Sequence, residues 1–172
     1  MALDLGSIAT TLLGSGSLNG IAASTGASKN DISSVLQSAL PLLLNGAAKQ
    51  STGKTTATSF AEALEQHAST PTSSLSSFFK NVDANDGAKI VEHLLGKSSN
   101  TTAKKIAKET GLDTEKVIKI LAVAAPLLMS LLGKKTKQAK KDDKTATTAA
   151  LAQALLGGGK VDVGNIITSL LK

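Results

Sequence analysis

Two stretches of the chain repeat one another, and this limits the folds that it can adopt. Residues 21–50 read IAASTGASKNDISSVLQSALPLLLNGAAKQ, and residues 106–135 read IAKETGLDTEKVIKILAVAAPLLMSLLGKK. The two stretches align without a gap at an offset of 85 residues, and ten of thirty positions are identical. Self-similarity of this kind indicates that one structural unit is used twice. We therefore predict two homologous units, residues 1–84 and 85–172, that pack as one globular body.

Each unit reads as a series of helices. The long segment of the first unit has apolar residues at offsets of 0, 3, 4, 7, 8, 11 and 12 from Ile32, and the second unit repeats this stripe from Val117. This spacing forms one broad apolar face on a helix, and no stretch alternates with the period of a strand. The fold class is predicted to be all-α, with about ten helices. They are expected at residues 4–13, 19–25, 29–47, 58–67, 73–81, 86–95, 101–110, 113–132, 146–156 and 162–171, with loops at 49–56, 69–72, 134–144 and 157–160.

A proline lies at the same place in both long segments. Pro41 and Pro126 are separated by the same offset of 85 residues. A proline inside a helix costs about 3 kcal/mol and bends it. Its presence in both copies predicts that a bend belongs to the unit, although a helix that stops at the proline and restarts is an alternative.

The two long helices differ on the face opposite the apolar stripe. This face is polar or small in the first copy and apolar in the second. A helix that is apolar all round must be covered on all sides. The second long helix is therefore expected either to be the central element of the fold or to face a partner subunit. The candidate interface residues are Ile118, Ala122, Val123, Leu127 and Leu131.

Both copies also have the spacing of a helix-turn-helix unit. A small residue lets two helices approach, a glycine makes the turn, and an apolar residue anchors the second helix. The two sets are Ala22, Gly26 and Ile32, and Ala107, Gly111 and Val117. As a signal for DNA binding the pattern is weak. In the second copy, Asp113 and Glu115 would repel phosphate where a major groove would lie.

The composition also disfavours specific recognition of nucleic acid. The chain has a net charge of +6 but no arginine, tryptophan or tyrosine. Arginine is the preferred reader of guanine, and aromatic rings are the usual platforms for bases. The lysine-rich stretch 134–144, KKTKQAKKDDK, is expected to be a solvated linker. The alternative is a weak, salt-sensitive polyanion contact. It would use Lys134, Lys135, Lys137, Lys140, Lys141 and Lys144.

The sequence offers no constellation of catalytic or metal-ligating residues. Cysteine is absent, and the two histidines, His67 and His93, have no ligand partner at helical spacing. Residues 83–87, DANDG, hint at a calcium loop, but the glycine comes one position early, so a helix-capping turn is expected. We therefore predict no enzyme activity and no cofactor.

The hydropathy pattern predicts a cytoplasmic protein. The start, MALDLGSIATTLLG, lacks the basic leader and long apolar stretch of a signal peptide. The longest apolar run, residues 120–132, is shorter than the roughly 20 residues that a membrane span needs. We therefore expect no membrane span.

The motifs resemble those of one bacterial family. Units of the form I-A-x-x-T-G, followed by a helix ending in A-x-P-L-L and separated by D-G-A-x-I-x-x-H-L-L-G, are similar to the YidB-like domain of unknown function. The resemblance covers about residues 3–171 and is strongest over 86–96 and 110–128. It implies an all-helical bacterial protein with a homeodomain-like motif, and it implies no activity.

These observations favour a non-catalytic helical module. We expect it to act through protein–protein interaction, with another protein as its partner, or through self-assembly into a homo-oligomer. The alternative is a nucleic-acid-binding protein that uses the helix-turn-helix-like units.

Overall fold

The computed structural model describes residues 5–52 and 57–140, and these residues form helices without a strand. The prediction of an all-α fold is confirmed for this part of the chain. In chain order the helices are α1 (Leu5–Leu13), α2 (Ser15–Thr25), α3 (Lys29–Thr52), α4 (Ala57–Ala68), α5 (Leu75–Lys80), α6 (Ala84–Leu95), the 3₁₀ turn η1 (Gly96–Ser98), α7 (Ser99–Thr110) and α8 (Thr114–Lys140).

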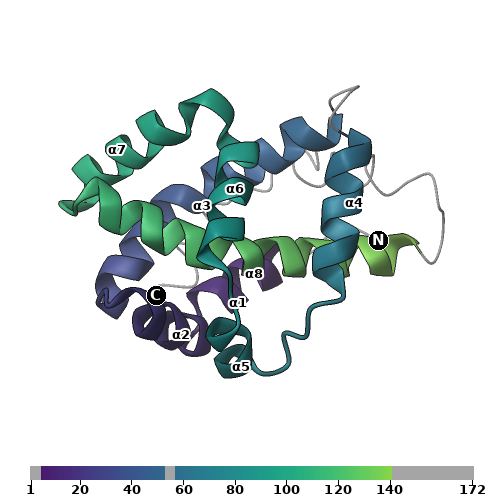
Figure 1. Cartoon of the computed structure of the whole chain (residues 1–172), viewed down its shortest axis with the longest axis horizontal. Helices are drawn as coiled ribbons and strands as arrows, with labels where there is room; N and C mark the ends of the chain where they lie inside the picture. Colours follow the sequence, from purple (N-terminus) through teal and green to yellow (C-terminus); the bar gives the residue numbers. More distant parts are fainter. Residues whose placement is uncertain (1–4, 53–56, 141–172) are drawn as a thin grey trace.

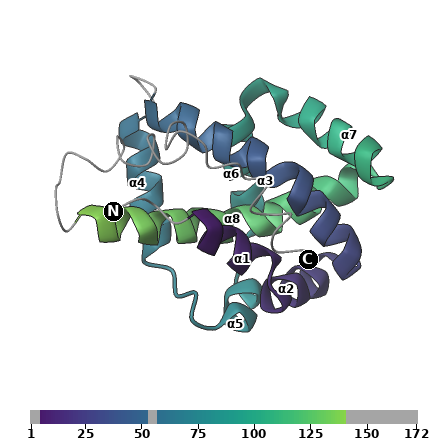
Figure 2. The ribbon, with the colours of Figure 1, turned by 180° about the vertical axis from the view of Figure 1, so that it is seen from behind.

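Helix α8 runs through the middle of the molecule. It contacts α1, α2, α3, α4, α6 and α7. Figure 1 shows α6 and α4 crossing one side of α8, and Figure 2 shows α1 on the opposite side. Residues 120–130 are all buried. Of the two alternatives for this helix, the central element of the fold is therefore the correct one, because the chain's own helices cover it on every side.

The apolar stripes of α3 and α8 form the centre of the core. All fourteen stripe residues, which begin at Ile32 and Val117, are 4% exposed or less. Burial of a leucine, isoleucine or valine side chain stabilises a fold by about 1.5–3 kcal/mol. The two long helices therefore supply much of the hydrophobic stabilisation, as the stripe predicts.

Both prolines lie inside uninterrupted helices. Pro41 is inside α3 and Pro126 is inside α8, so the alternative of a helix that stops at the proline is wrong. Because Pro126 has no N–H, the carbonyl group of Ala122, four residues earlier, loses its helical donor. The hydroxyl of Ser130 donates to the carbonyl oxygen of Pro126 at 2.9 Å.

Two helices cross α8 at glycines. Gly87 of α6 lies against the carbonyl oxygen of Ala122, and a β-carbon at this glycine would overlap with that oxygen. Gly133 of α8 lies equally close to the carbonyl oxygen of Leu64 in α4. The absence of side chains at these two positions lets the backbones approach, so the glycines fix where α6 and α4 cross α8.

The two predicted turns have the same geometry. Gly26 has φ of 74° and Gly111 has φ of 73°, a left-handed conformation that glycine adopts without strain. In each case the preceding threonine, Thr25 or Thr110, donates its hydroxyl to the carbonyl oxygen four residues earlier at 2.7 Å. The α2–α3 and α7–α8 pairs thus share their connection as well as their sequence.

The predicted helix boundaries are wrong mainly where a helix runs on. Helix α3 continues to Thr52, so the predicted loop at 49–56 is wrong for residues 49–52. Helix α8 continues to Lys140, so the predicted linker at 134–144 is wrong for residues 134–140. Lysine, glutamine and alanine are good helix formers, and lysine near a helix C-terminus interacts favourably with the helix dipole. The predicted helices at 146–156 and 162–171 and the loop at 157–160 lie outside the described residues.

One helix has the length and composition of a membrane span. The segment Thr114–Lys134 of α8 meets that criterion, whereas the shorter run 120–132 had been expected not to. In the structure, 78% of its most apolar window is buried inside the protein. The central helix of a folded core meets the same criterion, so this composition is weak evidence for a membrane span.

Candidate functional site

Most of the predicted interface lies in the core. Ala122 and Val123 are 4% exposed and Leu127 is 0% exposed. For these three residues the interface prediction is wrong, because the chain's own helices cover this face of α8. Leu131 is half-buried and packs against the core. Ile118 is 39% exposed, and it is the exposed large hydrophobic residue of the described chain.

Ile118 lies beside a shallow groove at the start of α8. The groove has a volume of about 90 Å³ and lies between α6 and α7, with Leu121 and Val91 among its lining residues. Charged side chains lie near it: Glu92 is part of the groove, and Lys119 Nζ lies 3.5 Å from Glu115 Oε1. An apolar side chain is thus surrounded by polar ones.

The corresponding position in the other copy is polar. Ser33 precedes Ile118 by 85 residues, and its hydroxyl accepts a hydrogen bond from Gln37 Nε2 at 2.9 Å. The two long helices begin after the same kind of turn. They therefore present different chemistry at matched positions, and the apolar version belongs to α8.

The predicted polyanion contact is changed by one tertiary interaction. Lys134 is half-buried, and its ammonium group donates to Thr72 Oγ1 at 2.5 Å. This lysine therefore ties α8 to the segment after α4 and differs from a solvated linker residue. The backbone of Lys135, Lys137 and Lys140 belongs to α8, whose side chains are described only as far as residue 134. Lys141 and Lys144 lie outside the described residues.

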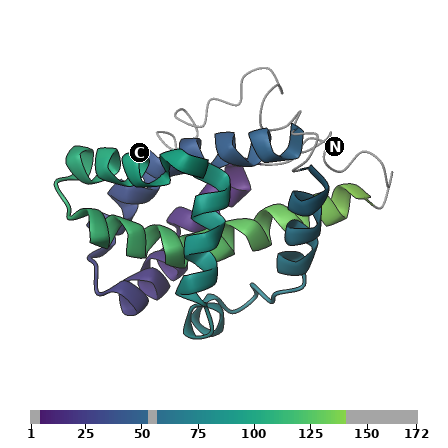
Figure 3. The ribbon, with the colours of Figure 1, turned by 45° about the horizontal axis from the view of Figure 1, so that its top comes forward.

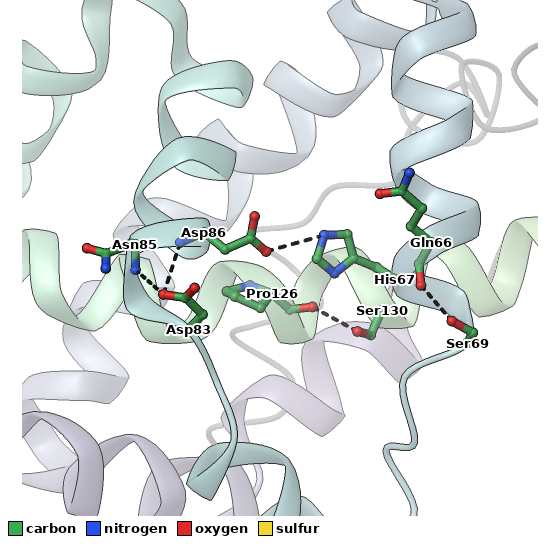
Figure 4. Close-up of polar contacts among 8 residues, drawn as sticks. All are labelled: Gln66, His67, Ser69, Asp83, Asn85, Asp86, Pro126 and Ser130. Atoms are coloured by element: carbon green, nitrogen blue, oxygen red, sulfur yellow. Dashed lines mark hydrogen bonds and ion pairs between the residues drawn. The ribbon is translucent and has the colours of Figure 1, made fainter.

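A polar pocket near α4 and α6 was missed by the sequence analysis. It has a volume of about 320 Å³, and its lining includes His67, Asp83, Asp86 and Pro126. Figure 4 shows the ring of His67 facing the carboxylate of Asp86, and the two atoms His67 Nε2 and Asp86 Oδ2 are 3.7 Å apart. These residues are 19 positions apart in sequence and lie on different helices, so no sequence spacing identifies the pair.

Asp83 has a structural role in this pocket. Its Oδ1 accepts hydrogen bonds from the backbone N–H groups of Asn85, at 2.8 Å, and Asp86, at 3.4 Å. These bonds cap the N-terminus of α6. The expectation of a helix-capping turn at residues 83–87 is therefore confirmed. Across residues 5–52 and 57–140, no group of three histidine, aspartate or glutamate residues is placed to hold a metal ion.

Comparison with known proteins gives one match. The model of a family described as bacterial protein of unknown function (DUF937) matches residues 10–135. The expectation of a bacterial domain of unknown function is therefore confirmed. No curated protein and no solved structure matches the chain.

Proposed function

The chain belongs to the bacterial protein family of unknown function DUF937, and we propose that it is a non-catalytic helical module that binds a protein through the surface around Ile118. The observation that carries this proposal is the exposed isoleucine at the start of α8. A single exposed apolar residue is common on protein surfaces. The position of this one is what supports an interface, for two reasons.

The first reason is its surroundings. Ile118 lies beside a groove lined by apolar and polar residues, with Glu92 at the groove and Glu115 and Lys119 on the same helix. Energetically important interface residues are characteristically apolar side chains surrounded by polar contacts that exclude water. The second reason is that the matched position of α3 is Ser33. The apolar side chain therefore is not required by the shared helical framework.

The proposal includes the finer features of the sequence analysis. We take the α2–α3 and α7–α8 pairs to be two copies of one helix-turn-helix-like element, in a YidB-like protein that acts in the cytoplasm. The matched left-handed turns at Gly26 and Gly111 and the matched threonine hydrogen bonds support the duplication. The partner is either a second copy of the chain or another protein.

Site-specific crosslinking tests this interface. The chain has no cysteine, so Ile118→Cys carries one photoreactive maleimide at a known place. We expect the purified variant, returned to native lysate, to give one discrete adduct. Unlabelled wild-type protein should compete with it, and Ile118→Asp should compete at least about tenfold more weakly, because a carboxylate loses its hydration in an apolar contact.

The control places the same probe at the matched position of α3. Ser33→Cys should give no such adduct, and mass spectrometry of the Ile118→Cys adduct distinguishes a second copy from another protein. Adducts at both positions, or equal competition by Ile118→Asp, would contradict an interface at this surface.

Nucleic-acid binding is the second candidate, and one observation favours it. Lys29, Asn30 and Ser34 are exposed at the start of α3, directly after a left-handed turn, where a recognition helix would begin. A salt titration with random and selected DNA duplexes tests it. A preferred sequence that stays bound above about 150 mM salt supports DNA reading, whereas complete loss by that concentration leaves only lysine electrostatics.

A further inference from the structure

We propose that an apolar pocket between α3, α4, α6 and α8 binds a small uncharged molecule that carries one hydrogen-bonding group. The pocket has a volume of about 310 Å³ and lies away from the surface around Ile118. Its walls include Phe60, Ile90, Leu94 and Met129, each no more than 7% exposed. Ligand pockets in proteins typically have volumes of about 300–1,000 Å³ and apolar walls, so this one suits a ligand at the small end of that range.

The pocket exists because two helices cross α8 too far apart to fill the space between them. Helix α6 crosses at Ala122, and α4 crosses at Gly133, eleven residues further along. At 1.5 Å per residue these crossings are about 16 Å apart, whereas packed helices have axes about 8–10 Å apart. Figures 1 and 3 both show α6 and α4 crossing α8 at separate places. Met129 lies between the two crossings and contributes to the pocket lining.

The two crossing positions are fixed by backbone contacts. Gly87 and Gly133 lie so close to carbonyl oxygens of the facing helices that neither crossing can slide along α8 without breaking the contact. At the far end of α6, Gln50 Nε2 donates to the carbonyl oxygen of His93 at 2.8 Å, which joins α3 to α6. On the opposite side, the His67–Asp86 pair joins α4 to α6. The frame of the pocket is thus held on both sides.

The chemistry of the lining favours an uncharged occupant. The lining residues include no lysine, aspartate or glutamate. A charged ligand would lose its hydration without an opposite charge to replace it, which is costly. The polar side chains among the lining residues are Gln50, Ser59 and His93. A hydroxyl and an imidazole can each donate or accept a hydrogen bond, so they suit a ligand with one amine, amide or hydroxyl group.

A fluorescence titration tests the pocket. N-phenyl-1-naphthylamine is uncharged, apolar and carries one N–H group, and its emission rises when it leaves water. The chain has no tryptophan or tyrosine, so its own emission does not interfere. We expect saturable binding of one probe per chain. 8-Anilinonaphthalene-1-sulfonate has similar rings with a negative charge, and it should bind at least about tenfold more weakly. Equal affinity for the two probes would overturn the proposal.

Two variants locate the binding place. Ala63 belongs to the pocket lining, so Ala63→Leu should narrow the pocket and weaken binding of the uncharged probe at least about tenfold. Ala23 lines a separate groove between α2 and α5, so the matched exchange Ala23→Leu should leave binding unchanged. Unchanged binding by Ala63→Leu, or equal weakening by Ala23→Leu, would place the probe elsewhere and overturn the proposal.

A measurement on the unmodified protein keeps the test independent of folding defects in the variants. The chain has two methionines, Met1 and Met129, and only Met129 is a described lining residue. With ¹³C-labelled methionine methyl groups, the uncharged probe should shift the Met129 resonance and leave Met1 in place. A Met129 resonance that does not move at saturating probe would contradict binding in this pocket.

Discussion

Leu127→Ala is expected to lower the free energy of unfolding by about 2–5 kcal/mol. Leu127 is 0% exposed and lies in the middle of α8. Truncation would remove buried methyl groups and leave a cavity among helices that cannot fully collapse into it. Urea denaturation followed by circular dichroism at 222 nm measures this loss. An interface residue on the surface of a monomer would instead change association and leave the unfolding of the monomer almost unaffected.

The chain provides a matched control for this substitution. Leu42 precedes Leu127 by 85 residues, in the corresponding position of α3, and it is only half-buried. Leu42→Ala should therefore cost less than Leu127→Ala, because less apolar surface is removed from a packed environment. Equal losses for the two variants would show that α3 and α8 are equivalent in the core, contrary to the central position of α8.

Gly87→Ala should be the most damaging exchange of a single methyl group. An alanine in an open helical position stabilises a helix by about 1 kcal/mol relative to glycine. At Gly87, however, the added carbon would overlap with the carbonyl oxygen of Ala122, which is backbone and cannot rotate away. Helix α6 would have to move off α8. We expect a loss of about 3 kcal/mol or more in the same denaturation experiment.

An exposed position on the same helix serves as the control. Asn85→Ala keeps the backbone N–H that Asp83 accepts, and its side chain is exposed. Its effect should stay within about 0.5 kcal/mol. If Gly87→Ala were as stable as the wild-type protein or more stable, the close crossing of α6 over α8 would be absent.

The helical framework could be predicted because its signals are local. The stripes that begin at Ile32 and Val117 specify which face of each long helix is buried, and Gly26 and Gly111 mark the turns before them. Both signals depend on residues within a few turns of one another, so a single sequence carries them. The lengths of α3 and α8 were underestimated because good helix formers continue beyond the apolar stripe.

The role of the second apolar face could not be predicted. An apolar face on α8 is compatible with burial inside the chain and with burial against a partner, because the sequence pattern is the same in both cases. The structure shows that α6 covers this face, with Gly87 against Ala122. Leu42 and Leu127 illustrate the same point, since identical residues at matched positions differ in burial.

The pockets were missed for a related reason. His67 and Asp86 belong to helices that meet only because both cross α8. The apolar pocket likewise depends on the spacing of two crossings, at Ala122 and Gly133, and not on a motif. Only Ile118 keeps the role that the sequence suggested for the whole face, because it lies at the end where α6 and α7 leave α8 uncovered.

Native-state hydrogen exchange tests the central position of α8 most directly. If α8 is the buried axis of one bundle, the backbone amides of residues 120–130 should exchange only through global unfolding, with a free energy equal to that from denaturation. The amides of α5, a six-residue helix at the edge, should exchange faster. Exchange of residues 120–130 at the rate of α5 or faster would contradict a fold built around α8.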